Sequence, residues 1–229
     1  MSLLNLNHKE LTDEPEYISV NRRAYDQLSH EYQRRSLQKS PFETPASEII
    51  DTMIQTKAIG GSSAVLEIGP GSGEAAAYFA SLNCRTVAVD ISAEIIKVAR
   101  KNSPTTEFIL SDILQADFEE YTFDIIFAGA LIHLFPASDA EKLLSIIKTW
   151  MKTDGRLFIS TTIHSKSEEG YLVKSDYQGK IKRFRKKWTE GEFKSFLEKS
   201  FEILNTLYTD EVDRNKKWVG HICRKKNYE

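Results

Sequence analysis

The chain has 229 residues, of which 41% are hydrophobic and 28% are charged, with a formal net charge of −2. This composition is ordinary for a globular protein with one well-buried core, and the near balance of charges excludes a general attraction to nucleic acid or to an anionic membrane surface. No apolar run approaches the ~20 residues that a membrane-spanning helix needs.

Cysteine and histidine usage narrows the class further. Cys84 and Cys223 lie far apart and outside any C-x-x-C pattern, so we expect free thiols rather than a disulfide. The five histidines show no metal-ligand spacing. The first residues lack the basic start and long apolar stretch of a signal peptide. We therefore expect a cytoplasmic protein, monomeric or homodimeric, without a metal or a membrane segment.

The first element expected along the chain is a helix over residues 15–35. Ile18, Tyr25, Leu28 and Tyr32 fall near one face at helical spacing, so this face should pack against the rest of the protein.

A second helix is expected to begin at Pro45 with Thr44 as its N-cap. Proline suits the first helical position, and the threonine hydroxyl can accept a hydrogen bond from the first turn. Gly60-Gly61 ends this helix and leads into residues 64–68, an apolar run typical of a buried strand.

A glycine-rich turn joins this strand to the next helical stretch. Gly69, Gly71 and Gly73 give the spacing G-x-G-x-G, and Glu67 stands two positions before the first of them. Glycine can adopt a positive φ and lets a ligand approach the main chain, while the helix that follows points its N–H groups towards that ligand. The dinucleotide fingerprint is G-x-G-x-x-G, so this spacing argues against a nicotinamide-dependent oxidoreductase.

Three further apolar strands follow, and two of them are expected to end in an acid. Residues 86–90 end at Asp90, residues 108–112 end at Asp112, and residues 123–128 form the fourth strand. The carboxyl ends of parallel strands meet at one edge of an α/β sheet, so these carboxylates are expected to share a cleft with the glycine turn.

This ordered series over residues 64–135 resembles the class I S-adenosylmethionine (AdoMet) methyltransferases. The resemblance implies an α/β fold with a Rossmann-like, seven-stranded mixed sheet in the order 3-2-1-4-5-7-6. Strand 7 would be antiparallel, with helices on both faces and an N-terminal helical lid. It also implies AdoMet as the cofactor and S-adenosylhomocysteine (AdoHcy) as the product.

The resemblance assigns roles to individual residues. Glu67 would contact the amino-acid end of AdoMet, Asp90 the ribose hydroxyls and Asp112 the adenine amino group. The other cofactor-binding residues that it implies are Gly69, Pro70, Gly71, Gly73, Ile91, Ile113, Ala128 and Tyr25. Tyr25 belongs to the expected lid helix, and the plainer interpretation is that it only packs this helix down.

Residues 1–43 are expected to form the lid extension, and residues 44–229 the methyltransferase domain with a substrate-side insertion at about 164–188. The elements expected in the second half are a helix from Ser138, a turn at Asp154-Gly155, a strand over 156–163, a helix opened by the capping box Thr189-x-x-Glu192, and a strand pair over 201–208 and 217–224.

Six of the eight residues 180–187 are basic. They could form a solvated amphipathic surface with Ile181 and Phe184 turned inwards, or Arg183 could grip an anionic acceptor through two hydrogen bonds. Tyr171 and Tyr177 would then wall the same substrate-binding pocket.

His133, just past the fourth strand, is the candidate catalytic base, because its unperturbed pKa lies near 6.5. The alternatives are that it lines the substrate pocket or is purely structural. His164, at the end of the fifth strand, is a further candidate for contact with the substrate.

The main hypothesis is an AdoMet-dependent methyltransferase acting on an oxygen, nitrogen or carbon atom of a small-molecule acceptor, which could be anionic. An RNA-modifying methyltransferase is a rival, but the Asn/Asp-Pro-Pro-Tyr/Phe loop of enzymes that methylate base amino groups is replaced by residues 128–131, Ala-Gly-Ala-Leu. Nucleic acid is therefore an unlikely partner. A second rival is a non-catalytic AdoMet-binding subunit.

Overall fold

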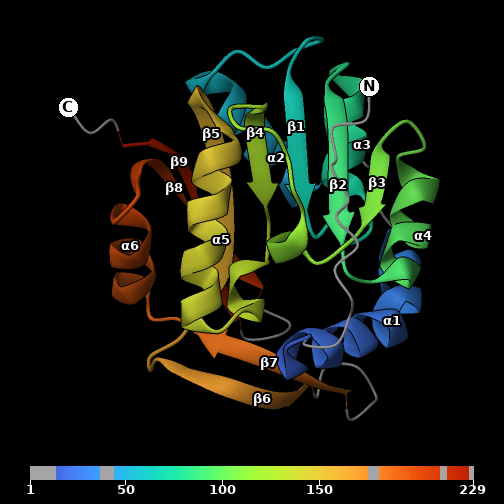
Figure 1. Cartoon of the computed structure of the whole chain (residues 1–229), viewed down its shortest axis with the longest axis vertical. Helices are drawn as coiled ribbons and strands as arrows, with labels where there is room; N and C mark the ends of the chain where they lie inside the picture. The colour runs from blue at the N-terminus through green and yellow to red at the C-terminus, as the bar shows by residue number, and fades with distance from the viewer. Residues whose placement is uncertain (1–13, 37–43, 175–180, 212–215, 227–229) are drawn as a thin grey trace.

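The computed structural model describes residues 14–36, 44–174, 181–211 and 216–226 (Figure 1). Its main sheet has seven strands in the order β3-β2-β1-β4-β5-β9-β8. The strands are β1 (Ala64–Ile68), β2 (Arg85–Asp90), β3 (Glu107–Leu110), β4 (Phe123–Ala128), β5 (Met151–Ile163), β8 (Phe201–Glu211) and β9 (Lys216–Lys225). Strands β1 to β5 are parallel, and β9 runs antiparallel to both β5 and β8. The predicted order and the antiparallel seventh strand are confirmed.

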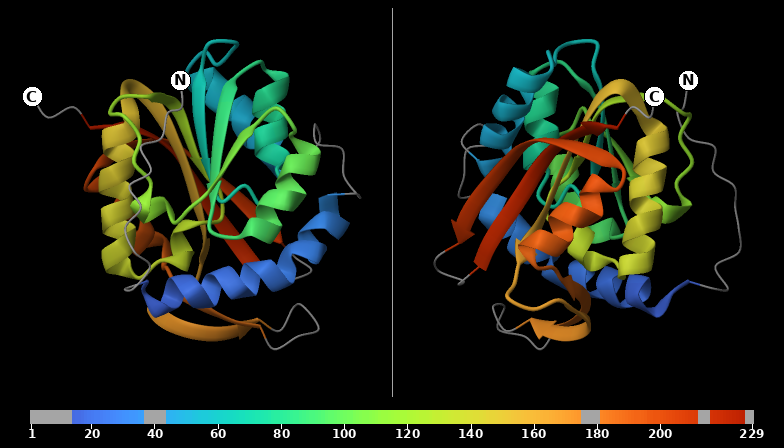
Figure 2. Two further views of the ribbon diagram at one scale, coloured as in Figure 1. Left: turned by 45° about the vertical axis from the view of Figure 1, so that its right-hand side comes forward. Right: turned by 90° about the vertical axis from the view of Figure 1, so that its left-hand side faces the viewer.

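Helices cover both faces of this sheet (Figure 2). The helices of the main fold are α2 (Pro45–Thr56), α3 (Glu74–Ser81), α4 (Ala93–Asn102), α5 (Ala137–Trp150) and α6 (Glu190–Glu198). One apolar cluster joins α5 and α6 to one face of the sheet, and a second joins α2 and α3 to the other. Because successive residues of a strand point to opposite faces, Leu66 and Val65 fall in different clusters. Both faces are buried, which explains the continuous apolar character of the central strands.

Two predicted helix starts are confirmed by their capping geometry. Thr44 accepts a hydrogen bond from Ser47 N, and Thr189 accepts one from Glu192 N while the Glu192 carboxylate accepts from Thr189 N. The start of α5 differs from the prediction. It begins at Ala137, after Pro136 and without a side-chain cap.

Two strand boundaries also differ from the prediction. β3 ends at Leu110, so Asp112 lies beyond the strand, where its carboxylate accepts from Leu114 N at 3.0 Å and caps the short 3-10 helix η1 (Ile113–Gln115). This local bond takes Asp112 off the strand ladder. β5 begins at Met151, and the expected Asp154-Gly155 turn lies inside its span, where the register with β4 shifts.

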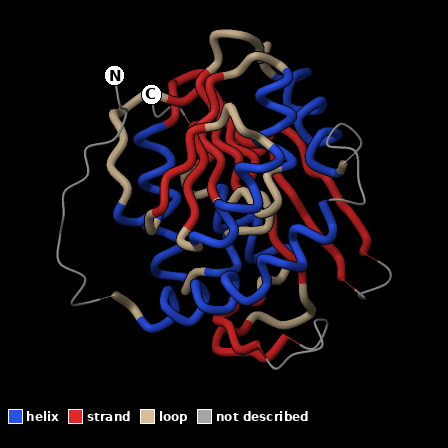
Figure 3. The backbone as a smooth tube through the Cα atoms, turned by 90° about the vertical axis from the view of Figure 1, so that its right-hand side faces the viewer, coloured by secondary structure: helices blue, strands red, loops and turns tan. Residues whose placement is uncertain are grey.

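The expected insertion forms a separate two-stranded antiparallel sheet of β6 (Glu168–Lys174) and β7 (Ile181–Lys187). The basic run therefore contributes most of β7. Tyr177 lies outside the described residues. The small sheet lies at the end of the main sheet where the parallel strands finish, beyond the long helix α1 (Glu16–Ser36), as Figure 3 shows from the side.

Side-chain bonds fix α1 across this end of the sheet. Asn21, which is buried, donates through Nδ2 to Leu134 O at 3.0 Å and accepts through Oδ1 from Phe184 N at 2.8 Å. Asp139 accepts a hydrogen bond from Tyr17 Oη at 2.8 Å. One buried amide thus ties the helix both to the loop after β4 and to β7.

Cys84 and Cys223 are buried free thiols, as expected. Among the described helices, none has the length and apolar character that crossing a membrane requires.

Candidate active site

A cavity of about 380 Å³ opens where β1, β2 and β4 end, under α1. The predicted cofactor residues that line it are Tyr25, Glu67, Gly69, Pro70, Gly71, Asp90, Ile91, Asp112 and Ile113. The three acids therefore share one cleft, although they lie far apart in the sequence. Gly73 and Ala128 are not in the lining; Ala128 is fully buried in the core.

The glycine turn is shaped by positive φ angles. Gly69 has φ 73° and Gly71 has φ 55°, a region that residues with a side chain adopt at a cost. A Cβ on Gly71 would also lie 3.2 Å from a ring atom of Tyr32, so the turn admits this aromatic ring of α1 because it has no side chain.

Gly73 serves packing rather than the cavity. It has φ 84°, and a Cβ there would lie 2.8 Å from Ala99 O in α4. Its role is to let the start of α3 approach α4 closely.

Glu67 is a buried carboxylate at the floor of the cavity, only 3% exposed. Burial raises its pKa to about 8, opposed by a hydrogen bond from the backbone of Ala76, with the neighbouring charge of Asp90 raising it further. Its Oε2 atom is buried and has no hydrogen-bond partner among the described residues. A buried, unpaired carboxylate oxygen is costly, and a ligand that donates a hydrogen bond or carries a positive charge would relieve it.

Asp90 and Asp112 accept hydrogen bonds from backbone N–H groups at the starts of helices. Asp90 accepts from Ser92 N at 2.8 Å, and burial raises its pKa to about 7. Burial also raises the pKa of Asp112. Each carboxylate keeps acceptor capacity beyond these bonds, because an ionised carboxylate can accept several hydrogen bonds.

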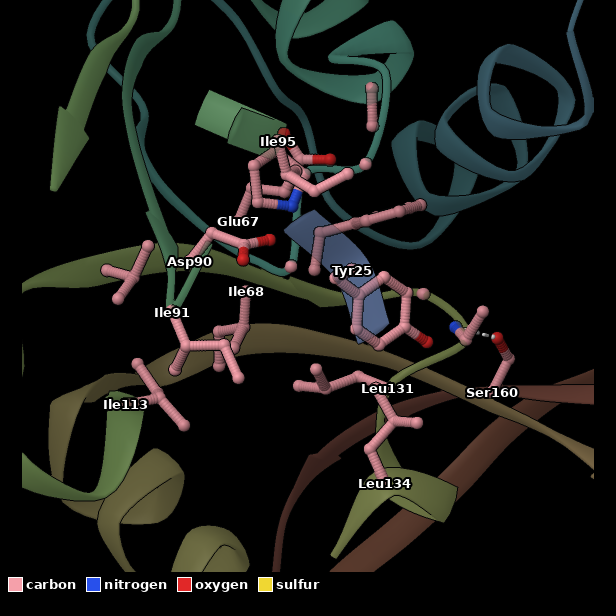
Figure 4. A pocket seen from close by; sticks show the side chains of 18 of the residues that line it. Tyr25, Glu67, Ile68, Asp90, Ile91, Ile95, Ile113, Leu131, Leu134 and Ser160 are labelled. Atoms are coloured by element: carbon pink, nitrogen blue, oxygen red, sulfur yellow. Dashed lines mark hydrogen bonds between the residues drawn. The ribbon is translucent and has the colours of Figure 1, made fainter. Parts of the chain in front are cut away.

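All charged side chains in the described lining are acidic. It includes Glu74 besides the three predicted acids, and no lysine, arginine or histidine among the described residues. Ile68, Ile91 and Ile113 lie together beside Asp90 and provide a flat apolar surface (Figure 4). This end suits a ligand that has hydroxyl or amino donors, a cationic centre and an apolar ring, which is the donor set of AdoMet. The residues present therefore fit that cofactor.

The other end of the cavity is aromatic and nearly uncharged. Figure 4 shows Tyr25, Leu131 and Ser160 there, away from the acids. Phe127 and Phe158 also line the cavity, with their rings stacked 4.8 Å apart. Ser160 Oγ accepts from Ala130 N at 2.8 Å, so its own proton can point to another acceptor.

Most of the lining residues were not predicted as site residues, among them the polar residues Asn21, Tyr32 and Ser160. Tyr32 carried a signal, because it lies seven residues after Tyr25 on the same helix face, and the rings are 6.2 Å apart. Ser160 is a polar residue near the end of a buried strand, which is also a usable signal. Asn21 had none, because its role depends on the two segments that it joins.

The predicted substrate residues that the structure describes lie outside the lining. His133 is 1% exposed; its Nδ1 lies 3.2 Å from Thr161 Oγ1, and its ring lies 5.8 Å from that of Trp218. Its side chain is not in the described lining of the cavity. The prediction that it acts as a base therefore gains no support from its position.

His164 and Tyr171 are exposed rather than in the cavity. His164 bonds to Thr162 Oγ1, and Tyr171 packs edge-on against Phe184 beneath the ammonium of Lys182. Arg183 is buried, and its Nη1 donates to Tyr25 Oη at 3.4 Å, immediately behind the lining. Of these residues, only Arg183 bonds to a side chain that lines the cavity.

Comparison with known proteins agrees with this geometry. Residues 65–155 match the methyltransferase domain family. A phosphoethanolamine N-methyltransferase from Triticum aestivum is 23% identical over 167 residues, which are 69% of this chain and 33% of that protein. The chain thus spans about a third of the length of this curated relative.

Solved structures share the fold over almost the whole chain. The 1,6-didemethyltoxoflavin-N1-methyltransferase of Burkholderia thailandensis, crystallised with AdoHcy, has a TM-score of 0.73 at 20% identity, covering 98% of this chain and 95% of that one. The cyclase SpnF has a TM-score of 0.68 at 13% identity, covering 93% and 97%. With its sheet order and these structural matches, the chain has the class I methyltransferase fold, and its residues 65–155 match the methyltransferase domain family.

Proposed function

We propose that this protein is an AdoMet-dependent methyltransferase that acts on a small-molecule acceptor. The observation that carries the proposal is the convergence of Glu67, Asp90 and Asp112 on one cavity without a cationic side chain among its described lining residues. The buried, unpartnered Oε2 of Glu67 adds to it, because such an atom suits a cationic or hydrogen-bond-donating ligand.

In this proposal each acid has its own partner on the cofactor. Glu67 holds the amino-acid end, Asp90 the ribose hydroxyls and Asp112 the adenine amino group, with Ile91 and Ile113 against the adenine ring. Gly69 and Gly71 have no side chains, so the cofactor can approach the main chain at these positions. AdoMet supplies an electrophilic methyl group on a sulfonium, which is already a good leaving group.

The chain's own contribution is then to position the acceptor and exclude water, since holding two reactants in line can supply much of a rate enhancement. Tyr25, Phe127 and Phe158 provide the walls, and Ser160 provides a hydrogen bond. No histidine is in the described lining, so the proposal assigns no proton transfer to His133. An acceptor that needs no deprotonation, or that enters already ionised, suits this end best.

We propose further that α1 acts as the lid, with residues 1–43 as the lid extension and residues 44–229 as the methyltransferase domain. The support is that Tyr17, Ile18, Asn21, Tyr25 and Tyr32 of α1 line the cavity. The bonds of Asn21 to Leu134 and Phe184 would have to break for the lid to open.

Calorimetric titration with AdoMet, AdoHcy and NAD tests the cofactor assignment. We expect AdoMet and AdoHcy to bind and NAD not to bind. Binding of NAD alone would contradict the proposal. Turnover is then followed as AdoHcy release with a panel of small-molecule acceptors and with tRNA. Tight AdoMet binding without turnover on any acceptor would favour the non-catalytic alternative.

A further inference from the structure

Arg183 is a buried cation that has no counterion among the residues that the structure describes. The residue is 8% exposed, and its one hydrogen bond runs from Nη1 to Tyr25 Oη at 3.4 Å. It makes no ion pair with a described residue. A guanidinium has five N–H donors, and no nitrogen of Arg183 is among the fully buried atoms without a partner, so its remaining donors stay accessible to solvent or to a ligand.

Lys186, three residues further along β7, is a buried cation that does have an acidic partner. It is 6% exposed, and its Nζ lies 2.8 Å from Glu192 Oε1 and 2.6 Å from Ser167 Oγ. Burial of a charge without such a partner is costly. The same strand therefore carries one buried cation that is neutralised within the protein and one that is not.

The hydrogen bond from Arg183 orients the phenol group of Tyr25. Because the phenol oxygen accepts from the guanidinium, its own O–H proton is left to point elsewhere, and no described residue accepts it. Tyr25 lines the cavity at the end that holds Ser160 (Figure 4). A cation behind the phenol strengthens the hydrogen bond that the phenol donates, as for other charge-assisted bonds.

We propose that Tyr25 and Arg183 together recognise an anionic oxygen of the methyl acceptor. Tyr25 donates the direct hydrogen bond, and Arg183 is a positioning residue that orients the phenol and supplies the missing half of an ion pair. The acceptor is then an acid with an apolar body, since Phe127 and Phe158 also line the cavity. This inference rests on the proposed function and specifies its substrate class.

The test uses the full-length protein saturated with AdoHcy and pairs of aromatic ligands that differ only in charge, benzoate with benzamide and salicylate with salicylamide. We expect the carboxylate of at least one pair to bind roughly ten-fold tighter than its amide. Tyr25→Phe and Arg183→Gln should each remove this preference, and Arg183→Gln should leave the affinity for AdoHcy unchanged. Arg183→Lys should restore part of it.

Lys182→Gln is the matched control, because it removes a cation one residue away that lies over the exposed Tyr171 ring. It should leave the charge preference intact. Absence of a charge preference in every pair, including no binding at millimolar concentration, overturns the proposal. Loss of AdoHcy affinity in Arg183→Gln overturns it in favour of the cofactor carboxylate as the anion.

Thermal unfolding without ligand gives a second test that needs no acceptor. If Arg183 awaits a ligand, Arg183→Gln should leave Tm unchanged or raise it, while Lys186→Gln should lower Tm because it breaks a buried pair. A fall in Tm for Arg183→Gln as large as that for Lys186→Gln would assign Arg183 a structural role. Failure of the wild-type protein to bind AdoHcy would instead defeat the proposed function, and the stability comparison would still decide this inference.

Discussion

The two ends of the cavity differ in how they are built. The end with Glu67, Asp90 and Asp112 is made of the ends of neighbouring parallel strands and the turns that follow them, and it is acidic. The end with Tyr25 and Ser160 is assembled from α1, β5 and the loop after β4, and its nearest buried charge, Arg183, is positive. A fixed, general cofactor end and an adaptable acceptor end are what one fold needs to serve many substrates.

The largest effect is expected from substitution of Asp90, at the acidic end of the cavity. Asp90→Ala should weaken AdoMet binding by roughly 1–3 kcal/mol, as expected for the loss of hydrogen bonds to a charged group. The affinity of Asp90→Asn should lie between those of the wild type and Asp90→Ala, because asparagine keeps the shape of the side chain and one acceptor oxygen. Calorimetry with AdoHcy measures the effect. Unchanged affinity in Asp90→Ala would mean that the acidic end does not hold the ribose.

The buried acids should also make the stability of the protein depend on pH. Burial raises the pKa of Glu67 from 4.5 to about 8 and that of Asp90 from 3.8 to about 7. A raised carboxyl pKa contributes stability at low pH that is lost as pH rises through the folded value. We therefore expect Glu67→Gln, which mimics the protonated acid, to match the wild type near pH 5 and to exceed it in Tm by a few degrees near pH 8.5.

Scanning calorimetry of the two ligand-free proteins at several pH values measures this difference. Comparing the variant with the wild type also removes the opposite contribution of His221, whose pKa burial lowers. About 2–4 °C in Tm corresponds to 1 kcal/mol for a domain of this size. A difference in Tm that stays constant with pH would show that Glu67 is ionised in the cavity despite its burial.

At the aromatic end, Ser160→Ala should reduce kcat/KM by a factor equivalent to about 0.5–1.5 kcal/mol, the usual net value of a neutral hydrogen bond. AdoHcy affinity should not change, because Ser160 lies away from the acids (Figure 4). Ser160→Thr, which keeps the hydroxyl, is the control. Weakened AdoHcy binding in Ser160→Ala would show that the two ends are not separable.

The smallest effect on turnover is expected at His133. It is buried against Thr161 and Trp218, so His133→Gln should lower Tm and leave the pH profile of kcat nearly unchanged. Loss of an acidic limb near pH 6.5 in that profile, together with a large fall in kcat, would restore His133 as the base.

Much of the acidic end could be predicted from the sequence, because its parts are local. A strand, a glycine turn and a helix N-terminus are adjacent in the chain, and parallel strands bring their carboxyl ends to one edge. Asp112 shows the limit: its position was anticipated, but a hydrogen bond to Leu114 N moved it off the strand. The aromatic end was predicted poorly, because His133, His164 and Tyr171 were selected for their chemistry and proved to point elsewhere.

The sequence by itself determined the strands, the glycine turn and the three acids, because periodicity and the residues at strand ends are properties of short segments; the sheet order followed only from the family resemblance that these segments carry. Only the tertiary structure decided which residues face the acceptor. Tyr25 and Arg183 are 158 residues apart, and Asn21 and Phe184 are 163 apart. Such pairs form only when α1 is laid against β7, and their energies depend on burial and missing partners, which no local pattern encodes.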